Sequence, residues 1–205
     1  MRNGAQALSV GNEVSRVVVS RQEIARRVRR LARQIEADYA GGELTILAVL
    51  TGSLIFLSDL IRRLPLKMKL TLVSVSSYPG KFTTSCGPRF TLPKDCDLSG
   101  KDVLVVDDIL DSGLTLKALL DVVAAMGPGT LQTCVLLKKD RPDLPGRMDC
   151  DYIGFNVRRD FLVGYGLDYD NFYRNLPDIR VLDLKLLYNR RRRAAKRAPG
   201  RKARP

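Results

Sequence analysis

Histidine is absent from the 205 residues of the chain. This absence excludes any mechanism with a histidine base, a histidine-activated nucleophile or a histidine metal ligand. Acid–base chemistry must therefore fall to aspartate, glutamate, lysine, tyrosine or cysteine side chains. A bound metal is expected to be a hard cation that prefers oxygen ligands.

Cysteine and long apolar runs are also scarce. The four cysteines form no CxxC pair, which argues against a zinc site or a disulfide framework: Cys86, Cys96, Cys134 and Cys150. No run approaches the roughly 18 consecutive apolar residues of a membrane-spanning helix. The first residues lack the apolar core of a signal peptide. We therefore expect a reduced, cytoplasmic protein that does not cross a membrane.

The charge of the chain is unevenly distributed. Basic residues exceed acidic ones to give a formal net charge of +13, and nine of the basic residues lie in segment 189–205, which contains no acid. We expect residues 1–188 to form one domain, because this length suits a single hydrophobic core. Segment 189–205 is expected to be a disordered basic tail that contacts nucleic acid only weakly, if at all.

Strand and helix patterns alternate along the domain. A capping box at Ser20 and Glu23 predicts the start of a helix, which Gly41 and Gly42 end. Apolar or β-branched runs predict strands at 17–19, 44–50, 67–78, 103–107, 131–137 and 151–157. Helices are expected after Ser53 and over 114–126, and a long loop over 79–90. This alternation indicates an α/β fold with a mainly parallel sheet and crossover helices.

The most informative stretch is VVDDILDSGLT, residues 105–115. Its three aspartates follow an apolar strand, where negative charges repel one another and lose solvation. Residues 111–113 and Thr115 surround the predicted strand-to-helix turn, whose free amides and helix dipole favour an anion such as phosphate. Asp107 and Asp108 would instead suit ribose hydroxyls, directly or through Mg²⁺. A capped turn with solvated acids would explain the same residues without a ligand.

The longer stretch VLVVDDILDSGLT resembles the signature with which type I phosphoribosyltransferases bind 5-phosphoribosyl-1-pyrophosphate (PRPP). LTGS (50–53) resembles the pyrophosphate loop of that family, SSY (76–78) the start of its flexible loop, and LLKKD (136–140) its purine-reading segment. DYIGF (151–155) and FLVGYGLDY (161–169) resemble its base-binding hood, and YRNLPDIRVL (173–182) its closing strand. In order from about residue 17 to 182, these motifs are similar to those of hypoxanthine-guanine phosphoribosyltransferases.

The resemblance assigns roles to the central motif. Three residues are implied to hold the 5′-phosphate of PRPP: Ser112, Gly113 and Thr115. Asp107 and Asp108 are implied to bind the ribose hydroxyls and Mg²⁺, and Asp111 to act as the general acid/base near purine N7. Negative charge in this place also fits an oxocarbenium-like transition state, because it stabilises the cation that develops at C1′.

Two loops complete the PRPP side of the resemblance. The implied pyrophosphate loop consists of Leu50, Thr51, Gly52 and Ser53. In the family the peptide bond between the first two of these residues is often cis. The implied flexible loop begins with Ser77 and Tyr78.

Purine recognition is implied for three residues. Lys139 would donate to purine O6, which selects 6-oxopurines over 6-aminopurines because an ammonium group cannot accept a hydrogen bond. Tyr152 would stack on the purine, and Ile153 would contribute its backbone. The sequence departs from the family where an acid is expected to serve a second Mg²⁺, since Arg159 occupies that place and Asp160 follows. Either Asp160 reaches the metal, or Arg159 binds pyrophosphate directly.

The resemblance therefore implies a type I phosphoribosyltransferase fold. We expect a mainly parallel five-stranded sheet flanked by helices, with a small hood from about 14–20 and 151–182. The expected reaction converts hypoxanthine or guanine and PRPP to the nucleoside monophosphate and pyrophosphate, with Mg²⁺ as cofactor. The family implies a homodimer or homotetramer. Two alternatives stay open: a xanthine-directed relative, and an RNA-binding regulator of the same fold, which the basic tail would suit.

Overall fold

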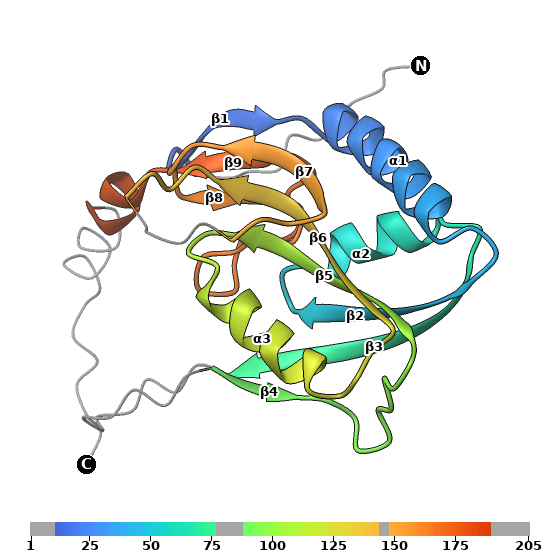
Figure 1. Ribbon diagram of the computed structural model, residues 1–205. Coiled ribbons are helices and arrows are strands. Elements are labelled where there is room, and N and C mark those ends of the chain that lie inside the picture. The colour runs from blue at the N-terminus through green and yellow to red at the C-terminus, as the bar shows by residue number, and fades with distance from the viewer. Residues whose placement is uncertain (1–10, 77–87, 144–147, 190–205) are drawn as a thin grey trace, which may run out of the picture.

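The computed structural model describes residues 11–76, 88–143 and 148–189, and Figure 1 shows how their helices and strands are arranged. The largest element is a six-stranded sheet in the order β4-β3-β2-β5-β6-β7. Its strands are β2 (Glu43–Leu50), β3 (Lys67–Ser76), β4 (Arg89–Thr91), β5 (Asp102–Leu110), β6 (Thr130–Lys139) and β7 (Tyr152–Val157). Neighbouring strands pair in parallel except at the edge, where β4 lies antiparallel to β3.

The five parallel strands confirm the expected α/β sheet, and β4 is an addition to it. Arg89 and Phe90 belong to a segment that the sequence predicted to be a loop, yet they pair with Ser76 and Val75 of β3. Phe90 packs against the core cluster beneath α3 (Leu114–Ala124), and its burial stabilises this short edge strand. The glycines and prolines of the segment favoured a loop prediction, because the sequence alone does not show that Phe90 is packed against the core. Residues 79–87 of the same predicted loop lie outside the described residues.

Helices cover both faces of the main sheet. α1 (Arg21–Asp38) and α2 (Leu54–Ile61) pack on one face, and α3 packs on the other. In β5, Leu104 and Val106 face α1 and α2, whereas Val103 and Val105 face α3. Because both faces are buried, this strand is continuously apolar rather than alternating. Any charged residue near its end must therefore be stabilised locally.

The capping box predicted for α1 is confirmed. The Ser20 amide donates to the Glu23 carboxylate at 2.8 Å, and the Glu23 amide donates to the Ser20 hydroxyl at 3.3 Å. The predicted apolar stripe forms the buried face of the helix, with Ile24, Val28, Leu31 and Ile35. The cap fixes where α1 begins, and the stripe fixes which side of the helix meets the sheet.

A second, antiparallel sheet forms the hood, in the order β1-β9-β8. It joins β1 (Val14–Val19) to β8 (Leu162–Val163) and β9 (Ile179–Leu182), as the sequence predicted for the two ends of the domain. The predicted hood segment 151–182 is wrong at its start, because β7 pairs with β6 and extends the main sheet. Burial of Tyr152 and Val157 in the main core favours that pairing.

A helical turn over residues 184–189 follows β9 and buries Leu187 in the same cluster as Val163. The predicted basic tail lies outside the described residues from position 190 onward. Within the part of the chain that the structure describes, no helix is both long and apolar enough to cross a membrane.

Replacing Ser20 by alanine should destabilise the fold by about 1 kcal/mol, because the first turn of α1 loses its side-chain cap. Chemical denaturation measures the change as a shift of the unfolding midpoint. Ser58→Ala, an exposed position inside α2, is the matched control and should change stability by less than about 0.5 kcal/mol. Equal midpoints for the two variants would show that the capping box contributes nothing.

Candidate active site

An open cavity of about 420 Å³ lies where β5, β6 and β7 end. Its wall combines the turn before α3, the end of β6 with the loop that follows, and the end of β7. The lining residues are Leu110, Asp111, Ser112, Gly113, Lys138, Lys139, Asp140, Arg141, Met148, Asn156, Val157 and Arg158. Ligands of open α/β sheets bind beyond the carboxyl ends of the strands, and this volume suits a small organic molecule.

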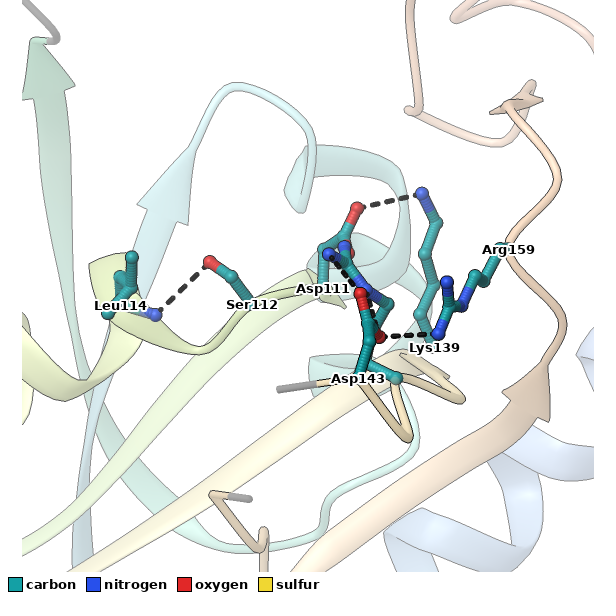
Figure 2. Close-up of polar contacts among 7 residues, drawn as sticks. Asp111, Ser112, Leu114, Lys139, Asp143 and Arg159 are labelled. Atoms are coloured by element: carbon teal, nitrogen blue, oxygen red, sulfur yellow. Dashed lines mark hydrogen bonds and ion pairs between the residues drawn. The ribbon is translucent and has the colours of Figure 1, made fainter. Parts of the chain in front are cut away.

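The turn between β5 and α3 forms one wall of the cavity. Gly113 directly precedes α3 with a φ of 80°, a left-handed conformation that glycine adopts without a steric penalty. A Cβ atom there would also lie 3.2 Å from Cβ of Met148. The Ser112 hydroxyl accepts a hydrogen bond from the Leu114 amide at 3.4 Å (Figure 2). The free amides of the first helical turn and the exposed Thr115 hydroxyl can together bind an anion.

Asp107 and Asp108 place two carboxyl groups near the end of β5. Asp107 is only 9% exposed, and its Oδ1 accepts a hydrogen bond from the Asp108 amide at 2.9 Å. Burial and the neighbouring Asp108 raise the pKa of Asp107 well above its ordinary value. Burial also raises the pKa of Asp108, although hydrogen bonds and the charge of Arg174 offset part of the rise. Such a pair favours the binding of a cation.

The predicted pyrophosphate loop packs directly against Asp108. The peptide bond between Leu50 and Thr51 is cis, as the family resemblance implied. A Cβ atom at Gly52 would lie 1.8 Å from Oδ2 of Asp108, so the close approach requires glycine. Ser53 is fully buried, and its hydroxyl donates to a carbonyl of β2, which fixes the loop at the start of α2. The structure therefore joins two motifs that lie far apart in the sequence.

Asp168 and Arg174 are two candidate functional residues that the sequence did not single out. Gly166 in the hood has a φ of 101°, and a Cβ atom there would lie 2.2 Å from the Gly52 carbonyl oxygen. Arg174 donates to the Gly166 carbonyl at 2.7 Å and forms an ion pair with Asp168 at 2.9 Å. Its charge also acts on Asp108. Both residues lie in the hood motifs 161–169 and 173–182, but only the fold shows that these segments approach the pyrophosphate loop.

Asp111 lies on the cavity wall, and both oxygens of its carboxylate have cationic partners (Figure 2). Oδ2 pairs with the Lys139 ammonium at 2.8 Å, and Oδ1 pairs with the Arg141 guanidinium. Burial acts to raise the pKa of Asp111, but these two partners outweigh it and hold the pKa below its ordinary value. Lys138 pairs instead with Asp149 at 2.8 Å. Of the two adjacent lysines, Lys139 is thus the one beside Asp111.

Two of the predicted purine contacts are wrong. Tyr152 is 5% exposed in the core cluster that α1 covers, and its hydroxyl donates to Asp38 at 2.6 Å. The Ile153 carbonyl accepts a hydrogen bond from Arg27 of α1. The cavity begins at Asn156, which lies roughly 13 Å further along β7 than Tyr152. The motif identified the correct strand, but this part of β7 turns its side chain into the core.

The residues at the departure from the family pattern have other partners. Asp160 forms an ion pair with Arg16 of β1 at 2.5 Å, and Arg159 forms one with Asp143 at 2.5 Å. Neither ion pair involves the aspartates of β5 or the pyrophosphate loop. The structure therefore supports neither of the two expectations for these positions, a metal ligand at Asp160 or a pyrophosphate contact at Arg159.

Among the described residues, no three Cys, Asp or Glu side chains converge to form a complete metal site. Magnesium sites often need only one or two carboxylates, because the substrate phosphates supply further ligands. The Asp107–Asp108 pair fits that pattern. The predicted start of the flexible loop, Ser77 and Tyr78, lies outside the described residues. The described site joins an anion-binding turn, a buried acid pair and an acid beside a lysine.

Comparison with known proteins identifies relatives over most of the chain. The family model of the phosphoribosyl transferase domain matches residues 18–170. The hypoxanthine-guanine phosphoribosyltransferase of Mycobacterium avium is 39% identical over 178 residues, which cover 83% of this chain and 87% of that protein. The protein of the same name from Aquifex aeolicus is 40% identical over 171 residues, which cover 82% and 94%.

Solved structures show the same relationship. A hypoxanthine-guanine phosphoribosyltransferase from Bacillus anthracis matches with 37% identity and a TM-score of 0.76, covering 83% of this chain and 99% of that one. The hypoxanthine phosphoribosyl transferase of Trypanosoma cruzi matches with 33% identity and a TM-score of 0.80, covering 89% and 98%. These matches confirm the predicted type I fold. The chain therefore belongs to the phosphoribosyltransferase family and, within it, to the hypoxanthine-guanine phosphoribosyltransferases.

Proposed function

We propose that the chain transfers a phosphoribosyl group from PRPP to hypoxanthine or guanine, which yields IMP or GMP and pyrophosphate. The names of its relatives support this purine-salvage activity. The observation that carries the proposal is the meeting of three groups at one edge of the sheet. These are the turn before α3, the adjacent acids Asp107 and Asp108, of which Asp107 is buried and Asp108 half-buried, and the ion pair of Asp111 with Lys139.

The ribose phosphate of PRPP would lie along the motif at the end of β5. Donor groups for the 5′-phosphate come from Ser112, Gly113 and Thr115 at the start of α3. Asp107 and Asp108 would accept hydrogen bonds from the 2′- and 3′-hydroxyls, since carboxylates would repel a phosphate. Their negative charge would also stabilise the positive charge that develops at C1′ as the old bond breaks.

The pyrophosphate group would lie between the loop at Gly52 and the hood. Amide groups of that loop and the Arg174 guanidinium are close to Asp108, where the leaving group must sit if Asp108 holds the ribose. Asp168 holds Arg174 through their ion pair. Arg174 thereby offers a fixed positive charge to the departing pyrophosphate.

Proteins of this family generally require Mg²⁺, and the residues present fit that cation. Asp107 and Asp108 offer oxygen ligands whose shared burial a positive charge would relieve. When bound, Mg²⁺ would supply charge neutralisation for the pyrophosphate. The two aspartates would hold it together with oxygens of PRPP.

The purine would occupy the cavity between β6 and the turn before α3. The Lys139 ammonium would donate to O6, and the 6-amino group of adenine is disfavoured because it is itself a donor. The proton on purine N7 would move to Asp111 while N9 bonds to C1′ and the C1′–pyrophosphate bond breaks. The Lys139–Asp111 ion pair, at 2.8 Å, supports this pair of roles.

Phe161 is a better candidate than Tyr152 for stacking on the purine. The residue is 37% exposed, and its ring meets that of Tyr169 edge to face, with 5.5 Å between the ring centroids. It follows the cavity-lining Arg158 by three residues and begins the FLVGYGLDY motif of the hood. An exposed aromatic side chain at this place offers the apolar surface that a flat base requires.

We further propose that the protein is a homo-oligomer, either a dimer or a tetramer. Leu70 and Leu72 lie on one face of β3 and are 45% and 43% exposed. Neighbouring aliphatic side chains that the helices leave exposed suit burial by a second copy of the chain.

Asp111→Asn should lower kcat by roughly 10²–10⁴-fold, the usual loss when a general acid/base is removed. The affinity for PRPP should remain, because the phosphate-binding turn keeps its amides. Initial rates of IMP formation measure the effect, with Asp121→Asn on the exposed face of α3 as the matched control. Near-normal kcat in Asp111→Asn would exclude Asp111 as the essential acid/base.

Replacing both Asp107 and Asp108 by asparagine should weaken the binding of Mg²⁺–PRPP by roughly tenfold to a hundredfold. Asparagine keeps the shape of the site but removes the charges that bind the cation. Titration calorimetry with Mg²⁺–PRPP measures the affinity, and the unfolding midpoint checks that the fold is intact. Unchanged affinity would mean that the pair is structural and that the ribose assignment is wrong.

Deleting residues 189–205 should leave purine turnover within a few-fold of the full-length chain. The segment lies beyond the family match, and nine like charges with few apolar residues favour solvation over docking. The deletion should also abolish retention on heparin at low salt. Loss of activity in a folded truncated protein would instead give the tail a part in the site or the oligomer. Tight, sequence-selective RNA binding by the full-length chain would favour the regulator alternative.

A further inference from the structure

Arg141 contacts Asp111 but has no part in the substrate contacts proposed above. One nitrogen of its guanidinium, Nη1, pairs with Oδ1 of Asp111. The other two, Nε and Nη2, lie 3.3 Å and 3.4 Å from the carboxylate oxygens of Asp143. Arg159 pairs with the same Asp143 at 2.5 Å. Ion pairs thus link these charges one after another in a row, and Lys139 pairs with the other oxygen of Asp111 (Figure 2).

This row of charges connects three separate segments. Asp111 belongs to the turn after β5, Arg141 and Asp143 to the residues after β6, and Arg159 to the residues after β7. A guanidinium is planar and donates in fixed directions, so carboxylates on two sides define its orientation. Asp143 and Arg159 therefore fix Arg141, and Arg141 in turn fixes Asp111.

Lys139 alone cannot neutralise Asp111 throughout the reaction. In the proposed complex its ammonium also donates to purine O6, so its positive charge is shared between the base and the carboxylate. Burial then favours the neutral acid at Asp111, whereas nucleotide formation requires a carboxylate that accepts the N7 proton. Arg141 keeps its positive charge under all these conditions, because a guanidinium does not deprotonate in proteins.

We propose that Arg141 is a positioning residue that holds Asp111 as an ionised carboxylate directed at the purine. Asp143 and Arg159 hold Arg141 in that place. This inference rests on the proposed function, and in particular on Asp111 as the acid/base. In nucleotide formation the N7 proton moves to Asp111, N9 bonds to C1′, and the electron pair of the C1′–oxygen bond leaves with pyrophosphate. No further reactant is needed.

The charged groups around Asp111 come from all the elements that surround the cavity. The end of β6 and the loop after it contribute Lys138, Lys139, Asp140, Arg141 and Asp143, and β7 is followed by Arg158 and Arg159. Asp107 and Asp108 of β5 precede Asp111 in the chain. Lys138 lines the same cavity but pairs with Asp149 rather than with Asp111. Its removal takes one positive charge from the cavity without removing a contact to Asp111, so it is the matched control.

The test is the pH dependence of kcat for IMP formation at saturating substrates, which reports groups of the enzyme–substrate complex, where Lys139 contacts the purine. Removing the positive charge of Arg141 raises the pKa of the neighbouring Asp111. The Asp111 carboxylate is then protonated at a higher pH, so activity begins to fall at a higher pH on acidification. In Arg141→Gln, the acidic limb of the kcat profile should lie at a higher pH than in wild type by roughly one unit. Arg141→Lys, which keeps the charge, should restore most of the wild-type profile, and Lys138→Gln should shift it much less.

A profile of Arg141→Gln that coincides with wild type would overturn the proposal. So would an equal shift in Lys138→Gln, because the effect would then be the general charge of the cavity. Carboxyl ¹³C NMR of the substrate-free protein gives a second readout, in which the Asp111 signal should titrate at higher pH in Arg141→Gln than in wild type. An Asp111 signal that titrates alike in both proteins would also contradict the proposal.

Failure of this inference can be distinguished from failure of the proposed function. If Asp111→Asn loses its activity and Arg141→Gln keeps the wild-type profile, Asp111 is the acid/base and only the role of Arg141 is wrong. If Asp111→Asn keeps near-normal kcat, the assignment of Asp111 fails, and the inference about Arg141 fails with it.

Discussion

Burial of the two adjacent acids at the end of β5 is the constraint around which the site is arranged. Helices cover both faces of this strand, Asp107 is buried and Asp108 half-buried at its end, and burial raises the pKa of both. The pyrophosphate loop approaches so closely that a Cβ atom at Gly52 would lie 1.8 Å from Oδ2 of Asp108, and the hood brings Arg174 to the same place. Arg174 offsets only part of the negative charge of the two acids, so the site suits a cation that binds together with a sugar phosphate.

The third acid of the same motif has the opposite environment. Asp111 is paired with Lys139 and Arg141, and its pKa lies below the ordinary value, although it is only three residues from Asp108. Environments that push the pKa values of neighbouring acids apart are a means of giving them different chemical roles. Here the buried pair suits cation and ribose binding, whereas the paired acid suits proton transfer at a base held by Lys139.

Local signals in the sequence predicted much of this structure. The capping box at Ser20 and the PRPP motif depend on neighbours within a few residues, so their structures follow from spacing and residue type. Contacts between distant segments could not be read in that way. The motif that located β7 gave the wrong orientation for Tyr152. Its side chain faces the core because it packs against α1 and donates a hydrogen bond to Asp38 of that helix. The positions of Arg174 and Arg141 likewise depend on how the hood and the loop after β6 fold over the sheet.

The central claim is that one edge of this sheet transfers a phosphoribosyl group to a 6-oxopurine. Initial rates with PRPP, Mg²⁺ and each of hypoxanthine, guanine, xanthine and adenine test it most directly. We expect nucleotide and pyrophosphate to form with hypoxanthine or guanine, and kcat/KM for adenine to be at least about a hundredfold lower, because Lys139 cannot accept from a 6-amino group. Adenine turnover equal to that of hypoxanthine, or no nucleotide with any of the four bases, would contradict the claim.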